Sequence, residues 1–107
     1  MSKTLNKLFW HDGNLADLSF SINEKGKSFL QMTAFFYKDE HAPDRDKYQI
    51  RCEGVSRFNN SLDAVELKNN MWAGNISSAY LKDSTLWVYF TDGILEINAN
   101  KFRLIRL

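Results

Sequence analysis

Residues 75–99 read NISSAYLKDSTLWVYFTDGILEINA, and this stretch decides the fold. Three runs of strand-forming residues are separated by two clusters that favour turns, KDS and DG. Apolar residues at alternate positions are typical of strands that bury one face, and connections this short join antiparallel neighbours. We therefore expect three adjacent antiparallel strands in this part of the chain.

The rest of the chain shows the same pattern. Strand-like runs occupy residues 15–22, 28–37, 46–55 and 101–107, with polar or glycine-containing turns between them. Helical signals are weak, although Ser61 is placed to cap a single turn through Leu67. The sequence predicts an all-β fold: one domain over residues 1–107, an antiparallel β-sandwich or rolled sheet of about seven or eight strands, with at most one short helix.

Composition limits the classes of partner. The chain of 107 residues has 14 Lys and Arg and 13 Asp and Glu, for a net charge of +1. Global charge therefore attracts neither nucleic acid nor an anionic membrane. The opening residues lack the apolar core of a secretory signal, and no apolar run approaches the ~20 residues that span a bilayer. We expect a cytoplasmic protein with no nucleic-acid and no membrane partner.

Two residues of the run YQIRCEGV (48–55) are assigned structural roles. Cys52, the only cysteine, falls on the same strand face as Tyr48 and Ile50, so we interpret it as a small buried apolar residue. Gly54 interrupts the alternation, which suggests a β-bulge or a close approach of backbone.

The pair His11-Asp12 is the first candidate for chemistry. A metal-dependent hydrolase would need further ligands, and the only other histidine, His41, stands at no recognisable ligand spacing. We expect Asp12 to bond backbone amides in the turn DGN, and the His11 ring to pack between aromatic residues. GKS at residues 26–28 is interpreted as part of a hairpin turn, since a strand follows where a phosphate loop needs a helix. The sequence thus predicts no catalytic residue, no metal and no cofactor.

Two features instead indicate a binding surface. In TLWVYFT (85–91), alternate residues fill one face and leave Trp87 and Tyr89 together on the other, either under a second layer or exposed as an interface. The loop KDEHAPDRDK (38–47) carries acidic side chains that suit a basic partner surface, namely Asp39, Glu40, Asp44 and Asp46. Basic residues are not interleaved with aromatic ones along the chain, so a stacking platform for single-stranded nucleic acid is not predicted.

The succession HDGNLADLSFSI (11–22), YQIRCEGVSRF (48–58) and NNMWAGNISSAYL (69–81), followed by a final strand pair, resembles a known group of proteins. These are small all-β bacterial immunity proteins of polymorphic and contact-dependent toxin systems. The resemblance implies that the chain neutralises one cognate toxin domain by binding it. It implies no catalytic residue. A nuclease is one candidate for the toxin, although the near-neutral charge departs from the strongly acidic inhibitors that often block nucleases.

We therefore expect a non-enzymatic immunity protein that binds a bacterial toxin domain, with an oligomeric state that the sequence leaves open. The alternatives are a small-ligand-binding β-barrel lined by residues 28–37, a β protein-interaction module of another kind and, less favoured, a hydrolase that uses His11 and Asp12.

Overall fold

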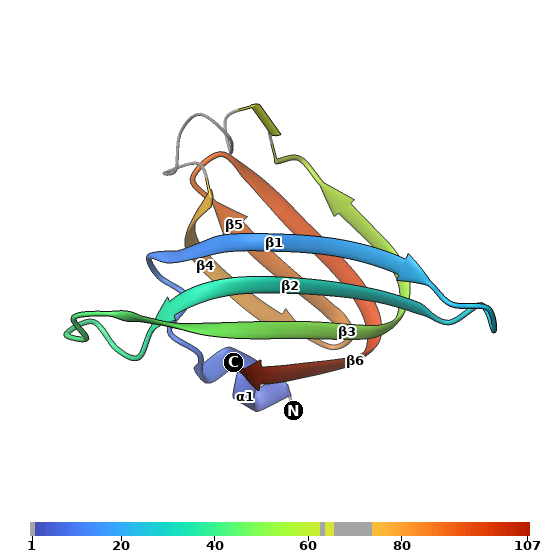
Figure 1. The fold of residues 1–107 in the computed structure, drawn as a ribbon, viewed down its shortest axis with the longest axis horizontal. Helices are drawn as coiled ribbons and strands as arrows, with labels where there is room; N and C mark the ends of the chain where they lie inside the picture. Colours follow the sequence, from blue (N-terminus) through green and yellow to red (C-terminus); the bar gives the residue numbers. More distant parts are fainter. Residues whose placement is uncertain (1, 63, 66–73) are drawn as a thin grey trace.

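The computed structural model describes residues 2–62, 64, 65 and 74–107. The elements are α1 (Ser2–Lys7), β1 (Gly13–Ile22), β2 (Ser28–Tyr37), β3 (Arg45–Asn60), β4 (Asn75–Lys82), β5 (Thr85–Phe90) and β6 (Gly93–Arg106). The strands form one antiparallel sheet in the order β1-β2-β3-β6-β5-β4, which closes where β1 pairs with β4 (Figure 1). The predicted all-β fold and rolled sheet are confirmed.

The described residues contain six strands, whereas the sequence predicted about seven or eight. Residues 94–99 and 101–107 were expected to form two strands, but pairing with β3 continues through Ala99 and Lys101, so both belong to β6. β3 also runs on to Asn60 instead of ending near residue 55. Of the helical turn predicted from Ser61 to Leu67, residues 63, 66 and 67 lie outside the described part of the chain.

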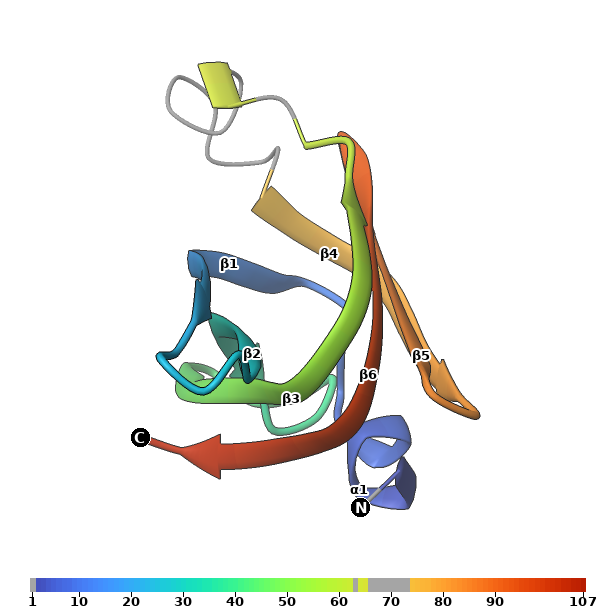
Figure 2. The same ribbon diagram turned by 90° about the vertical axis from the view of Figure 1, so that its right-hand side faces the viewer.

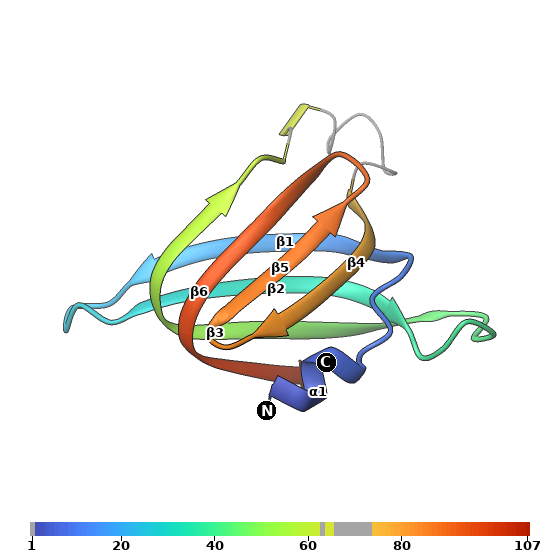
Figure 3. The same ribbon diagram turned by 180° about the vertical axis from the view of Figure 1, so that it is seen from behind.

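The barrel is flattened into two layers. Figure 1 looks onto β1, β2 and the first half of β3, and Figure 3 looks from behind onto β4, β5 and the first half of β6. The long strands β3 and β6 bend from one layer into the other (Figure 2). Gly54 follows Glu53, where the pairing of β3 with β2 ends, and has a φ of +65°; a Cβ there would be 2.6 Å from Nδ2 of Asn100. A β-bulge follows between Val55 and Arg57, just beyond Gly54, where it was expected. The close approach at Gly54 is to the side chain of Asn100.

Apolar side chains fill the inside of the barrel. Burial alternates most regularly in β5, and the buried apolar positions of the central strands are Leu30, Met32, Ala34, Phe36, Ile50, Cys52, Leu86, Val88, Leu95 and Ile97. Cys52 is fully buried beside Ile50, as predicted, and burial raises the pKa of its thiol to about 12. The thiol therefore stays protonated at neutral pH.

The helix α1, which the sequence did not predict, packs against one end of the barrel (Figure 1). Its Leu5 is 1% exposed, and Nε1 of Trp10 donates a hydrogen bond to the carbonyl of Leu5 at 2.8 Å. The amide of Asn6 exchanges two hydrogen bonds with the backbone of Leu81, at 2.8 and 2.9 Å. No helix in the described ranges is long and apolar enough to cross a membrane.

The alternation predicted for β1 buries fewer side chains than expected. Leu18 packs against the core, but Phe20 is 42% and Ile22 63% exposed. The β1–β2 hairpin extends beyond the rest of the sheet, where its inner face lacks an opposing layer (Figure 1). Phe20 instead contacts Phe58 of β3, with ring centroids 4.8 Å apart.

Candidate functional site

Four side chains form a row across the outer face of β4, β5, β6 and the end of β3. Pairing places Tyr80 opposite Trp87, Trp87 opposite Glu96, and Asn59 opposite Glu96. The neighbours of Trp87 along β5 are buried in the core, which directs its own side chain outward. We call these four residues the cross-strand row. It lies on the layer that faces the viewer in Figure 3.

Adjacent members of the cross-strand row are all in contact. The rings of Tyr80 and Trp87 stack with centroids 4.9 Å apart and an interplanar angle of 28°. Nε1 of Trp87 donates to Oε2 of Glu96 at 2.9 Å, and Nδ2 of Asn59 donates to Oε1 of Glu96 at 2.8 Å. The carboxylate therefore holds the indole in one orientation, and the indole supports the ring of Tyr80.

The same contacts keep Glu96 ionised. The hydrogen bonds from Asn59 and Trp87 lower the pKa of its carboxyl, and the charge of Arg57 lowers it further. A fixed negative charge thus lies beside the stacked rings of Tyr80 and Trp87. Tyr80 is 45% exposed, so the stack can be reached from solvent.

Tyr89 lies next to the cross-strand row on the same face of β5. The alternation predicted for residues 85–90 is confirmed, because Leu86, Val88 and Phe90 are buried while Trp87 and Tyr89 are half-buried. Desolvation raises the pKa of the Tyr89 phenol, and Tyr80 and Glu96 add to this effect. Its hydroxyl is therefore neutral at physiological pH and able both to donate and to accept a hydrogen bond.

A polar hollow of about 420 Å³ opens beside the aromatic stack. Oγ of Ser56 donates to Oδ1 of Asn98 at 2.6 Å, and Nδ2 of Asn98 donates to Oγ1 of Thr85 at 3.0 Å. The hollow is lined by Ser56, Arg57, Thr85, Trp87, Glu96 and Asn98. The surface thus combines aromatic area with ordered hydrogen-bonding groups.

The predicted acidic loop lies elsewhere. Residues 38–44 connect β2 and β3 at the end of their hairpin (Figure 1). Oδ1 of Asp39 accepts a hydrogen bond from the backbone amide of His41 at 2.9 Å, and Glu40 lies 3.3 Å from Nε2 of His41. Asp44 is exposed.

Asp46 does not belong to this loop. β3 begins at Arg45, one residue before the strand-like run predicted at 46–55, because Arg45 pairs with Tyr37 and its guanidinium lies 4.6 Å from the centre of that ring. Asp46 is therefore a strand residue, and its carboxylate lies 3.5 Å from Nη2 of Arg106.

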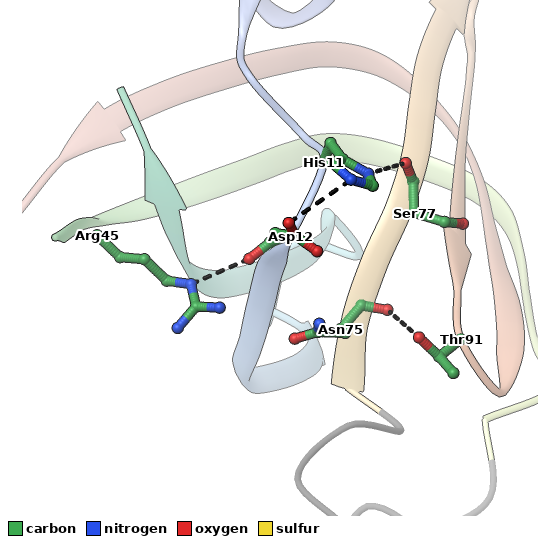
Figure 4. Close-up of polar contacts among 6 residues, drawn as sticks. All are labelled: His11, Asp12, Arg45, Asn75, Ser77 and Thr91. Atoms are coloured by element: carbon green, nitrogen blue, oxygen red, sulfur yellow. Dashed lines mark hydrogen bonds and ion pairs between the residues drawn. The ribbon is translucent and has the colours of Figure 1, made fainter. Parts of the chain in front are cut away.

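The His11 ring was expected to pack between aromatic residues, but its side chain is exposed. It is 64% exposed and meets one ring, that of Phe9, edge-on at 6.3 Å. Nδ1 of His11 lies 3.3 Å from the carbonyl of Ser77, and Nε2 lies 3.5 Å from the carboxylate of Asp12 (Figure 4).

Backbone groups of Asp12 hold the turn that precedes β1, where we expected its carboxylate to do so. Asp12 has a φ of +62°, and its amide donates to the carbonyl of Ile76 at 2.9 Å. Its carbonyl accepts a hydrogen bond from Nε of Arg45 at 3.0 Å (Figure 4). The turn therefore joins β1 to the starts of β3 and β4.

The turn at Asp12 and the acidic loop line one hollow, and Trp87 and Tyr89 are not part of it. This hollow of about 280 Å³ is lined by Phe9, His11, Asp12, Tyr37, Asp39, Glu40 and Ala42. Within the described residues, no group of three or more His, Cys, Asp or Glu side chains is placed to hold a metal ion.

Sequence reasoning identified Trp87 and Tyr89 but missed Glu96 and Asn59. Glu96 stands at an outward position of ILEIN, a signal that was present but weak, since outward polar residues are ordinary in strands. The contact with Asn59 joins residues 37 positions apart and depends on the β3–β6 register, which no local pattern encodes.

Comparison with protein-family models, with curated proteins and with solved structures finds no match to this chain.

Proposed function

We propose that this protein is a non-enzymatic protein-binding domain that engages its partner through the cross-strand row and Tyr89. One observation carries the proposal: Tyr80 and Trp87 form a stacked pair on an outer face, and a hydrogen bond to Glu96 on the neighbouring strand fixes the indole of Trp87. Aromatic side chains supply much of the affinity at protein interfaces, and a fixed orientation reduces the entropy lost on binding.

The kind of partner follows from the sequence resemblance. We propose that the partner is a bacterial toxin domain, which the protein neutralises by covering its active site or substrate path. The half-exposed aromatic pair, the neutral Tyr89 hydroxyl and the adjacent polar hollow support an interface with an apolar centre and a hydrogen-bonded rim.

A ligand-binding barrel is less well supported. That alternative required residues 28–37 to line a cavity, but their inward side chains, from Leu30 to Phe36, are fully buried in the packed core. Barrels of about eight strands have an interior just wide enough for side chains or one small ligand, and this sheet has six described strands.

The test is affinity capture from lysate of the cells that make the protein, with the tagged wild-type protein and two tagged variants. Tyr80→Ala removes the exposed half of the stack, and Phe35→Ala removes an aromatic side chain of similar exposure from the opposite layer. The captured polypeptide is then purified and titrated against all three proteins, and its toxicity is measured with and without each of them.

We expect Tyr80→Ala to weaken binding by about 2 kcal/mol, or about thirtyfold, and to lose protection, while Phe35→Ala keeps both. Unchanged thermal unfolding of Tyr80→Ala controls for folding. Equal affinity of wild type and Tyr80→Ala would remove the cross-strand row from the interface. A partner that is bound but is not toxic would contradict neutralisation.

A further inference from the structure

The layer opposite the cross-strand row carries a concentration of positive charge. Outward side chains of β3 and β6, together with one from the β1–β2 turn, supply five cations: Lys27, Lys47, Arg51, Lys101 and Arg103. Arg45, at the start of β3, is not counted, because its guanidinium lies over the Tyr37 ring and bonds the carbonyl of Asp12. Two acidic side chains share this surface, Asp17 and Glu53. The local net charge is 5 − 2 = +3, and the remaining nine basic and eleven acidic residues of the chain sum to −2. We call this surface the basic face.

Aromatic side chains alternate with these cations across the strands. Phe35 of β2 lies opposite Lys47 of β3 and is 37% exposed. The guanidinium of Arg51 lies 5.0 Å from the centre of the Phe29 ring. Basic and aromatic residues do not alternate along the chain, which is why no stacking platform was predicted, but the β2–β3 register interleaves them in space.

One end of the basic face is hollowed. Lys27, Phe29, Lys101 and Arg103 line a hollow of about 470 Å³ together with Gly54 and Asn100. Three cations from the β1–β2 turn and from β6 thus surround one opening. The carboxylate of Glu53 also lines it and lies 2.9 Å from Nε of Arg103, which leaves Lys27 and Lys101 as the positive charges beside that ion pair.

Two arginines occupy facing positions on this surface, since register places Arg51 directly opposite Arg103. The carboxylate of Glu53 offsets the charge of Arg103, whereas the guanidinium of Arg51 lies over the Phe29 ring. Arg51 therefore contributes a positive charge beside an aromatic ring.

We propose that the basic face binds single-stranded nucleic acid, with phosphates at the cations and a base stacked on Phe35. Proteins that bind single strands without sequence preference combine a basic track with exposed aromatic rings in this way. The shared chemistry of RNA and DNA, a phosphodiester chain with unpaired bases, is what these side chains recognise. The proposal does not depend on the protein-binding role of the opposite layer.

The test measures fluorescence anisotropy of labelled U12 RNA and dT12 DNA titrated with the full chain at several salt concentrations. Four phosphate contacts, at Lys27, Lys47, Arg51 and Lys101, predict a slope of about −2.8 in log K against log salt. Lys47→Ala/Lys101→Ala should weaken binding at least about tenfold and reduce the slope to about −1.4. Phe35→Ala should weaken binding about fivefold or more at every salt concentration.

Lys82→Ala provides the matched control, since Lys82 is an exposed lysine on β4, outside the basic face. Its affinity should equal that of the wild type, and thermal unfolding checks that every variant is folded. Tighter binding of U12 than dT12, or the reverse, identifies which nucleic acid fits and supports the proposal.

Three results would overturn the proposal: no binding of either oligonucleotide at low salt, equal losses for Lys82→Ala and the double variant, or equal binding of poly-glutamate and U12. The last result would make the surface a general anion binder. Because Tyr80→Ala leaves the basic face intact, loss of toxin binding in that variant with retained U12 binding separates the two proposals.

Discussion

Glu96 is the residue on which the candidate interface depends. Its two carboxylate oxygens accept hydrogen bonds from side chains on two different strands, Trp87 on β5 and Asn59 on β3. It therefore connects three strands on the outer face and sets the orientation of the aromatic stack. An interface anchor that is fixed before binding loses little entropy when its partner arrives.

Glu96→Gln should lower the unfolding temperature at neutral pH, because the amide group places a donor where the carboxylate accepts. The folded-state pKa of Glu96 lies below its unfolded value, so its stabilisation is present above the unfolded pKa and disappears as pH falls through the folded pKa. The difference between variant and wild type should therefore shrink in acid. Thermal melts across the acidic range measure it.

Glu24→Gln is the control, since Glu24 is exposed in the β1–β2 turn. This substitution should change the unfolding temperature little at any pH. A difference between Glu96→Gln and wild type that stays constant into strong acid would show that the charge of Glu96 does not stabilise the fold.

At the scale of elements, the bend in β3 and β6 determines what each outer face carries. The first half of β3 pairs with β2 and contributes Lys47 and Arg51 to the basic face. Its last residues pair with the start of β6 and contribute Asn59 to the cross-strand row. One strand therefore serves both surfaces because it leaves the layer of β2 after Glu53, where its pairing with β2 ends, and bends into the other layer (Figure 2).

Gly54→Ala should destabilise the protein by more than Gly26→Ala does. Both glycines have a positive φ, of +65° and +78°, so each alanine incurs a backbone cost of about 1–2 kcal/mol. A Cβ at Gly54 also meets the Asn100 side chain at 2.6 Å, whereas a Cβ at Gly26 meets nothing within 4 Å. Urea unfolding of both variants measures the difference.

Adding Asn100→Ala to Gly54→Ala should recover the part of the loss that the Asn100 amide group causes, and leave the backbone part and the 3.1 Å contact with Cβ of residue 100. If both single glycine variants are equally destabilised, the close approach at the bend has no energetic role.

The whole molecule is a flattened barrel with a filled interior and two outer faces of different character. The strands that carry the cross-strand row form one layer (Figure 3), and most of those that carry the basic face form the other (Figure 1). The small core must be complete for this arrangement to persist, and α1 completes it at one end through Leu5.

Leu5→Ala should lower the free energy of unfolding by about 2–5 kcal/mol, because Leu5 is 1% exposed and its loss leaves a cavity. Leu107→Ala changes a leucine that is 59% exposed and should shift the value by less than about 0.5 kcal/mol. Urea unfolding followed by tryptophan fluorescence measures both. Equal stability of the two variants would mean that α1 is not part of the cooperative fold.

The sequence by itself determined the strands and the sides of those strands that become buried. Alternation in residues 85–90 placed Trp87 and Tyr89 on one outer face, and the run around Cys52 predicted a buried thiol and a bulge near Gly54. These features depend on the two-residue period of a strand, which is local and therefore visible in the chain.

Only the tertiary structure decided which strands are neighbours and in what register. The contact of Asn59 with Glu96, the placing of Phe35 beside Lys47, and the packing of Leu5 under the barrel all join distant parts of the chain. Strand alternation specifies the face on which a side chain lies but not the strand beside it, because pairing is set by the packing of the whole core. Both proposed surfaces are made by that pairing.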